Sequence, residues 1–193
     1  MSRPKSYRNY VCDFETTVFE DQEYTEVWAA AVVELYSEDV SVFNSIGEFF
    51  RFIFSIDGNK RLYFHNLKFD GFFILSYLMD ILKWDQASYI DEQGQPAFYE
   101  TWEMKNRTFK YLISEMGQFY SITLKFKGQI VEIRDSLKLL PFSVKEIGRS
   151  FGTKHKKLEM DYAGFRYAGC EITPEEMAYI KNDVLVVKEA LEY

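Results

Sequence analysis

Hydrophobic and polar positions along this chain follow the pattern of a mixed sheet with flanking helices. Runs with a strand-like pattern lie at residues 8–14, 25–36, 39–43 and 61–65. Between the last two runs, Ser45 is placed to cap an amphipathic helix over residues 46–54. After Lys68, apolar residues recur at the spacing of a mostly buried helix. This order of elements predicts the α/β class, with a mixed β-sheet flanked by helices.

The second half of the chain has a different pattern. From about residue 85 to 135, strand-like runs alternate with turns, which we expect at Gln93-Gly94, Met116-Gly117 and Lys127-Gly128. We interpret this stretch as a small inserted β-rich lobe in a single domain that spans residues 1–193. Pro141 marks a break before a short helix at 143–150, and Thr173 caps a last helix. That helix lacks a stop signal, so we expect the chain to be part of a longer protein.

Composition limits the classes of protein to which the chain can belong. Of its 193 residues, 47% are hydrophobic and 27% are charged, which allows a sizeable core and argues against disorder. No apolar run reaches the ~18–20 residues of a membrane span, and the N-terminus lacks the apolar stretch of a signal peptide. Cys12 and Cys170 alone make neither a disulfide framework nor a four-cysteine zinc site, which favours a reducing, intracellular setting. Aromatic residues make up 18%, which suits either an aromatic core or a surface that stacks on flat ligands.

Charge is unevenly distributed along the chain. The net charge is −7, which argues against a protein that binds nucleic acid through general positive charge. Residues 125–157, however, hold nine Lys or Arg and three acids, so this window is +6 and the rest of the chain is −13. A basic strip on an acidic body is typical of a phosphate-binding protein with a carboxylate-rich metal site. A solvated charged face would have the same composition, and this alternative stays open.

Three short stretches carry the candidate chemistry. Asp13 and Glu15 are two apart at the end of a predicted strand, so their side chains lie on one face. Asp70 follows another predicted strand, and Tyr179 and Asp183 are one turn apart on the last helix. Clustered carboxylates repel one another unless a cation binds them, and oxygen ligands favour Mg²⁺ or Mn²⁺ over zinc. Two such ions ~4 Å apart can activate water and stabilise the leaving oxygen of a phosphodiester. Taken alone, each of these acids is more typical of a turn or a surface.

The combination of these stretches adds a resemblance to a known family. Asp13-x-Glu15, Asn66-x-x-x-Asp70 and Tyr179-x-x-x-Asp183 resemble the three motifs of the DEDD exonucleases, in the branch that has a tyrosine. The stretches CDFETT, LYFHNLKFDG, DSLK-x-LPF-x-VK and ITPEE-x-AYIKND are similar to the N-terminal proofreading domain of protein-primed family B DNA polymerases from small bacteriophages and linear plasmids. The resemblance runs from about residue 8 to the C-terminus and weakens over 85–110. It implies a ribonuclease H-like fold without a polymerisation domain, and a metal-dependent 3′→5′ exonuclease that acts on single-stranded DNA.

The resemblance also implies roles for individual residues. Two divalent cations, Mg²⁺ or Mn²⁺, would be bound by Asp13, Glu15, Asp70 and Asp183. Tyr179 would orient the attacking water, since a phenol with a pKa of ~10 is a poor base at neutral pH. Lys157 is our choice for the basic group near the scissile phosphate, although Lys154 and Lys156 are close and a solvated lysine-rich turn is an alternative.

A further set of residues looks like the positions that hold the 3′-terminal nucleotides in this family: Thr16, Tyr63, His65, Asn66, Phe69, Phe73, Ser136, Leu137 and Tyr162. Aromatic rings in this set can stack on bases, while Asn66 and Thr16 can form hydrogen bonds with sugar or phosphate. Two of them have structural alternatives. His65 could be a core histidine whose hydrogen bonds are satisfied, and Phe73 could belong to the core of its helix.

Three functions are compatible with these residues. The leading one is the proofreading exonuclease of a protein-primed DNA polymerase used in DNA replication. An RNA-directed exonuclease of the same superfamily would have the same catalytic core, and a module that binds a primer end or a partner protein would have little activity as an isolated fragment. For the leading function we expect a monomer that binds a single-stranded DNA 3′ end, and a terminal priming protein as a partner of the full-length polymerase. We expect no membrane association and a place in the cytoplasm of a bacterial host cell.

Overall fold

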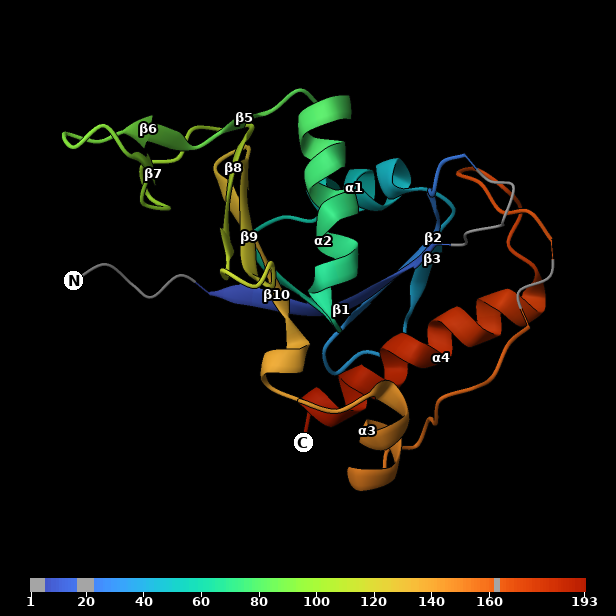
Figure 1. Ribbon diagram of the computed structural model, residues 1–193. Coiled ribbons are helices and arrows are strands. Elements are labelled where there is room, and N and C mark those ends of the chain that lie inside the picture. Colours follow the sequence, from blue (N-terminus) through green and yellow to red (C-terminus); the bar gives the residue numbers. More distant parts are fainter. Residues whose placement is uncertain (1–5, 17–22, 162–163) are drawn as a thin grey trace.

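The computed structural model describes residues 6–16, 23–161 and 164–193. Over this part of the chain, ten strands and four α-helices form an eight-stranded sheet, a separate two-stranded sheet and helices on both faces (Figure 1). The strands are β1 (Tyr7–Thr16), β2 (Val27–Glu34), β3 (Ser41–Phe43), β4 (Asn59–Phe64), β5 (Asp85–Gln86), β6 (Ser88–Ile90), β7 (Pro96–Phe98), β8 (Thr108–Ile113), β9 (Phe119–Phe126) and β10 (Gln129–Asp135). The helices are α1 (Ile46–Ser55), α2 (Leu67–Ser76), α3 (Val144–Ser150) and α4 (Pro174–Leu191), and short helical turns lie at Tyr77–Ile81 and Ser136–Lys138.

The main sheet has the strand order β3-β2-β1-β4-β10-β9-β8-β5. Its first three strands are antiparallel, and β4 and β10 then run parallel to β1. These five strands make the sheet of a ribonuclease H-like fold, which β9 and β8 extend as antiparallel strands. The predicted α/β class, with a mixed sheet flanked by helices, is confirmed.

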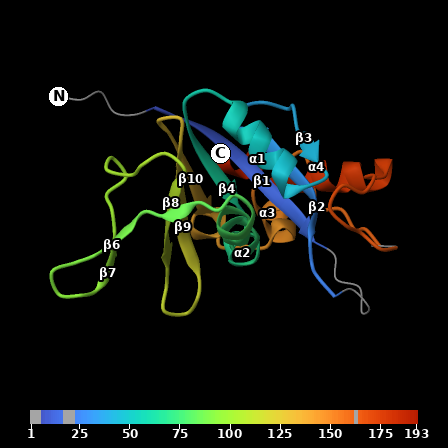
Figure 2. The same ribbon diagram turned by 90° about the horizontal axis from the view of Figure 1, so that it is seen from above.

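The stretch from residue 85 to 135 is rich in strands, and its three predicted turns lie between β6 and β7, β8 and β9, and β9 and β10. Only part of this stretch lies apart from the main sheet in the described residues. β10 joins the main sheet beside β4, and β9, β8 and β5 follow it. Within the described residues, the hairpin β6–β7 alone forms a separate sheet, which projects beyond the edge of the main one (Figures 1 and 2). Local periodicity predicts a strand but not its partner, so the sequence pattern alone does not separate strands of the lobe from strands of the main sheet.

Two apolar layers cover the sheet because side chains alternate between the faces of each strand. On one face, the rings of Phe14 and Phe64 meet edge to face at 4.9 Å, and Phe49 of α1 lies 5.1 Å from Phe14. On the other face, Val11 and Trp28 pack with residues of α3 and α4. β2 is buried along nearly its whole length because helices lie on both of its faces.

The helices begin where the sequence predicts. Ser45 caps α1 by accepting a hydrogen bond from the N–H of Glu48 at 3.2 Å. At the start of α4, Thr173 and Glu176 form a reciprocal capping box, and Pro174 is the first helical residue. Among the described helices, none combines the length and the apolar character needed to cross a membrane.

Gly71 allows α2 to lie close to β9. A Cβ atom on Gly71 would lie 2.8 Å from Cδ2 of Phe119, whose side chain is fully buried. We expect Gly71→Ala to lower the free energy of unfolding by about 1–3 kcal/mol, because an added methyl group in a packed core forces the ring and the helix apart. Gly47→Ala in α1 is the control, since its nearest contact would be an ordinary 3.6 Å. Denaturant unfolding measures both, and equal stability of Gly71→Ala and the parent chain would refute this steric account.

Candidate active site

The end of β1 and the middle of α4 bring three carboxylates together. Asp13 and Glu15 alternate with Phe14 along β1 and therefore share one face of the sheet. Asp183 lies on α4, which packs on β1 and β2. One oxygen from each of the three carboxylates lies within 4.8 Å of the other two. The three side chains line a cavity of about 270 Å³, together with His65, Lys157, Tyr179 and apolar neighbours.

This group holds strongly repelling negative charge. Burial raises the pKa of Asp13 well above its usual value. The nearby charges of Glu15, Asp70 and Asp183 raise the pKa of Asp13 further. Burial also raises the pKa of Asp183, although its ion pair with Lys157 opposes this shift. Either protonation or a bound cation would relieve this repulsion.

Asp70 lies in the first turn of α2 and is buried. Burial, and then the charges of Glu15 and Asp135, raise its pKa to about 8. Its carboxylate does not belong to the group of three within 4.8 Å. The structure therefore brings three of the four predicted metal ligands into one group, and Asp70 acts on that group through its charge.

The oxygen atoms of the group suit a hard divalent cation. Asp13, Glu15 and Asp183 offer carboxylate oxygens, which Mg²⁺ and Mn²⁺ prefer. Oδ1 of Asp183 is buried without a hydrogen-bond partner. A buried oxygen in this state costs free energy unless an ion or a water molecule satisfies it. The residues present therefore fit a divalent cation.

Lys157 reaches this group, whereas the two lysines beside it do not. Its ammonium forms an ion pair with Oδ2 of Asp183 and donates a hydrogen bond to the hydroxyl of Tyr179 at 2.7 Å. Burial works against the charged form, but the bonds to Asp183 and Tyr179 outweigh it and raise the pKa of Lys157. Lys156 donates to the carbonyl of Gly148, and Lys154 is exposed. Lys157 is thus the one of the three that lies at the carboxylates.

The predicted nucleotide contacts differ in how accessible they are. Phe69, at the start of α2, is 65% exposed and free to stack on a base. Phe73 is half-buried and packs against the apolar layer beneath α1 and α2. This position agrees with the alternative that Phe73 belongs to the core of its helix. Thr16, Tyr63 and Leu137 are half-buried at the ends of β1 and β4 and in the turn after β10. Tyr162 lies outside the described residues.

Asn66 begins α2 with an uncommon backbone conformation. Its φ of 69° lies in the left-handed region, which residues other than glycine rarely adopt. Its N–H donates to Oδ1 of Asp135 at 3.0 Å, and the N–H of Leu137 donates to the same oxygen at 2.9 Å. The buried Asp135 carboxylate therefore joins two stretches of predicted nucleotide contacts that are distant in the sequence. Strained backbone of this kind concentrates at functional sites.

His65 and Ser136 bond to each other within the protein. Nδ1 of His65 lies 3.0 Å from Oγ of Ser136, and Nε2 lies 2.8 Å from the carbonyl oxygen of Phe142. Burial lowers the pKa of His65, although the bond to Phe142 opposes this shift. Ser136 is fully buried, so its hydroxyl bonds within the protein in this structure, and its predicted contact with single-stranded DNA stays a prediction. Both ring nitrogens of His65 have hydrogen-bond partners within the protein, as the alternative of a core histidine expects. Its contact with DNA stays a prediction.

A second hollow lies beside Tyr63, and the sequence did not single out most of its residues. Tyr63, Arg134 and Ser121 form one row across β4, β10 and β9 because strand pairing sets them side by side. Together with Tyr120, Asp135, Lys138 and Leu139 they line a cavity of about 320 Å³. Nζ of Lys138 lies 4.6 Å from the centre of the Tyr120 ring. The basic window at 125–157 is the available signal, but it does not show which of its cations lie near Tyr63. Strand pairing places Arg134 there, and the turn after β10 places Lys138.

Comparisons with known proteins point to one family. The sequence profile of DNA polymerase type B, organellar and viral, matches residues 54–168. The DNA polymerase of Bacillus phage M2 is 40% identical over 194 residues, which cover 97% of this chain and 30% of the phage protein.

Structures of phi29 DNA polymerase are among the solved structures with a similar fold. Phi29 DNA polymerase complexed with single-stranded DNA matches with a TM-score of 0.77 and 35% identity, over 98% of this chain and 31% of that one. The same polymerase complexed with primer-template DNA matches with a TM-score of 0.77 and 36% identity, over 97% of this chain and 31% of that one. This chain therefore spans about three tenths of the length of the relatives that it matches.

Proposed function

Because the chain belongs to the type B DNA polymerases of organelles and viruses, we propose that it is the 3′→5′ exonuclease domain of a phage-type, protein-primed DNA polymerase. In this role it removes nucleotides from the 3′ ends of single-stranded DNA and so proofreads newly made strands. The observation that carries the proposal is the group of Asp13, Glu15 and Asp183 oxygens within 4.8 Å. Lys157 and Tyr179 line the same cavity, where a cation and a hydroxyl group can assist the hydrolysis of a phosphodiester.

Each side chain at the cavity has a part in this chemistry. Asp13, Glu15 and Asp183, with Asp70 nearby, would hold two cations, which when bound supply an activated water and stabilise the leaving oxygen. The hydroxyl of Tyr179 is held by Lys157 and orients the attacking water. The ammonium of Lys157 offsets negative charge that builds up on the phosphate in the transition state.

Stacking on Phe69 is expected to supply part of the affinity for single-stranded DNA. We expect Phe69→Ala to weaken binding by about 1–3 kcal/mol, because each base–aromatic stack contributes on that order. Phe72→Ala is the matched control, since Phe72 lies on the same helix, is 58% exposed, and packs edge to face on Phe119. Fluorescence anisotropy with a labelled oligonucleotide, in EDTA to prevent cleavage, measures both. Equal affinities of the two variants for the oligonucleotide would contradict the prediction that Phe69 stacks on a base.

The hollow beside Tyr63 suits the phosphates of the strand leading to the 3′ end. Lys138→Ala is expected to weaken binding at low salt and to reduce the slope of log affinity against log salt by about 0.7, as the loss of one phosphate contact to a single strand does. Lys105→Ala is the control, because Lys105 is exposed and lies outside this hollow. Binding titrations at several salt concentrations provide the slopes. A Lys138→Ala slope equal to that of the parent chain would contradict the phosphate contact.

Digestion of a single-stranded DNA oligonucleotide labelled at its 5′ end tests the proposed function. In Mg²⁺ or Mn²⁺, we expect a ladder of products that shorten from the 3′ end, and no products in EDTA. A strand whose 3′ end is blocked by an inverted nucleotide should resist digestion. Internal cuts, or no cleavage with either metal, would overturn the proposal.

An RNA oligonucleotide of the same sequence separates the two exonuclease hypotheses. Faster digestion of DNA supports the proofreading role, and faster digestion of RNA supports the RNA-directed alternative. Binding of a DNA 3′ end without cleavage would instead support a binding module.

The rest of the polymerase is part of this proposal. We propose that residues 1–193 form one exonuclease domain and that polymerisation and priming belong to the longer protein, where a terminal priming protein is a partner. A phage or plasmid polymerase of this kind acts in the cytoplasm of a bacterial host cell.

A further inference from the structure

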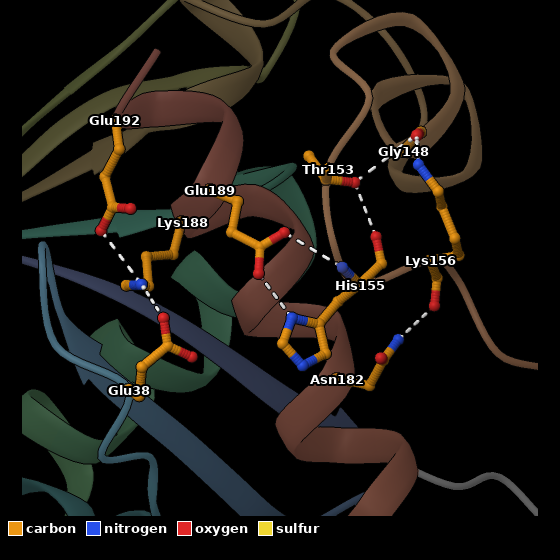
Figure 3. A network of polar contacts seen from close by, with 9 residues as sticks. All are labelled: Glu38, Gly148, Thr153, His155, Lys156, Asn182, Lys188, Glu189 and Glu192. Atoms are coloured by element: carbon orange, nitrogen blue, oxygen red, sulfur yellow. Dashed lines mark hydrogen bonds and ion pairs between the residues drawn. The ribbon is translucent and has the colours of Figure 1, made fainter.

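The segment between α3 and Lys157, residues 151–156, has no regular secondary structure, yet polar contacts hold it against α3 and α4. Figure 3 shows these contacts, with residues 153–156 on one side of α4 and Glu38 on the other. Lys157, which lies at the carboxylates, directly follows the segment. The position of its backbone therefore depends on what holds residues 153–156 in place.

Two residues of α4 hold the segment. Glu189 accepts a hydrogen bond from the backbone N–H of His155 at 3.0 Å, and its second oxygen lies 2.5 Å from Nδ1 of the same histidine. About two turns earlier on the helix, the side-chain amide of Asn182 donates to the carbonyl of Lys156. Asn182 is buried, and it directly precedes Asp183. The helix that carries Asp183 thus also fixes the two residues before Lys157.

The same segment is tied to the end of α3. The hydroxyl of Thr153 donates to the carbonyl of His155 at 2.6 Å and is 3.5 Å from the carbonyl of Gly148. The ammonium of Lys156 donates to the carbonyl of Gly148 as well. The segment is therefore held by both helices, and the side chain of Lys157 extends from its end toward Asp183 and Tyr179.

We propose that His155 and Asn182 are positioning residues that place the ammonium of Lys157 at Asp183 and Tyr179. This inference rests on the proposed function, in which Lys157 acts on the phosphate. A lysine side chain is a flexible four-carbon stem, so its ammonium is well placed only if its backbone is fixed. A displacement of ~1 Å at a catalytic group can lower a rate by about a hundredfold.

The other side of α4 provides a built-in control. Lys188 is buried and bonds to Glu38 at 3.2 Å and to Glu192 at 3.1 Å, which ties α4 to the connection between β2 and β3. This contact is of the same kind and on the same helix, but it does not involve the segment before Lys157. Glu38→Gln therefore tests whether loosening α4 in general is enough to impair cleavage.

A double-mutant cycle in the full chain tests the inference by cleavage of a 5′-labelled oligonucleotide in Mn²⁺. We expect His155→Ala and Asn182→Ala each to lower kcat by on the order of tenfold or more with less than about a twofold change in KM, as loss of a transition-state interaction does. His155→Asn should recover most of the rate, because its amide nitrogen lies close to the place of Nδ1. In a Lys157→Ala background, His155→Ala should have no further effect, since its influence passes through Lys157. Glu38→Gln should keep the parent kcat.

Two kinetic results would overturn the inference. One is an equal loss of kcat from His155→Ala with and without Lys157, and the other is a loss of the same size from Glu38→Gln. Hydrogen exchange provides a readout that does not need activity: the backbone amides of residues 154–157 should exchange faster in His155→Ala than in the parent chain. Unchanged exchange also overturns the inference. If the parent chain itself cleaves no DNA, the proposed function fails. The hydrogen-exchange experiment then tests, without any cleavage assay, whether His155 holds the segment.

Discussion

Replacing Asp13 and Glu15 together by alanine is expected to abolish metal-dependent cleavage of single-stranded DNA. The two residues supply two of the three carboxylates whose oxygens lie within 4.8 Å of one another. Without them a cation loses most of its ligands, and the transition state loses several kcal/mol of charge stabilisation, which corresponds to a rate reduction of ~10³-fold or more. Affinity for single-stranded DNA should remain close to that of the parent chain, because the exposed Phe69 and the hollow beside Tyr63 are unchanged.

Cleavage of a 5′-labelled oligonucleotide and anisotropy in EDTA measure the two effects separately. Glu92→Ala with Glu115→Ala is a control that removes two exposed carboxylates that do not line the cavity. This control should cleave like the parent chain. Cleavage that survives the loss of Asp13 and Glu15 would rule out the assigned metal ligands, and loss of DNA binding would show that the double variant has damaged more than catalysis.

The stability of the metal-free chain is expected to fall as the pH rises from about 4 to about 8. Burial and mutual repulsion raise the pKa of Asp13, Asp70 and Asp183, and that of Asp70 reaches about 8. An unfolded aspartate ionises near pH ~4, so between these values the folded chain binds more protons than the unfolded chain. Stability is therefore greatest below the unfolded pKa, and it declines until the folded pKa is passed. The loss is on the order of a few kcal/mol.

Added Mn²⁺ should reverse this loss, because a cation neutralises the ionised carboxylates and binds the folded state alone. We expect the rise in Tm on adding Mn²⁺ to be larger at pH 8 than at pH 5, as measured by thermal unfolding at both values. Asp70→Asn removes one of the buried charges, so it should raise the Tm of the metal-free chain at pH 8 more than at pH 5. A Tm that does not respond to Mn²⁺ at pH 8 would contradict the metal site.

The chain's own pattern of residues determined much of the fold and the nature of the site. Strand periodicity located β1 and β4, and the capping residues Ser45 and Thr173 located the starts of two helices. These features are local: a strand or a cap depends on residues a few positions apart, and the sequence contains all of them. The alternation of Asp13, Phe14 and Glu15 is of the same kind, because a period of two decides which side chains share a face.

Only the tertiary structure decided how distant segments meet. Strand pairing set β10 beside β4, and the same pairing set Arg134 beside Tyr63. Packing buried Ser136 against His65, and contacts with α4 brought Lys157, rather than Lys154, to Asp183. Each of these outcomes depends on residues far apart in the chain, whose separation in space follows from how strands pair and helices pack. A local pattern can specify which side chains are available, but it holds no information on which of them meet.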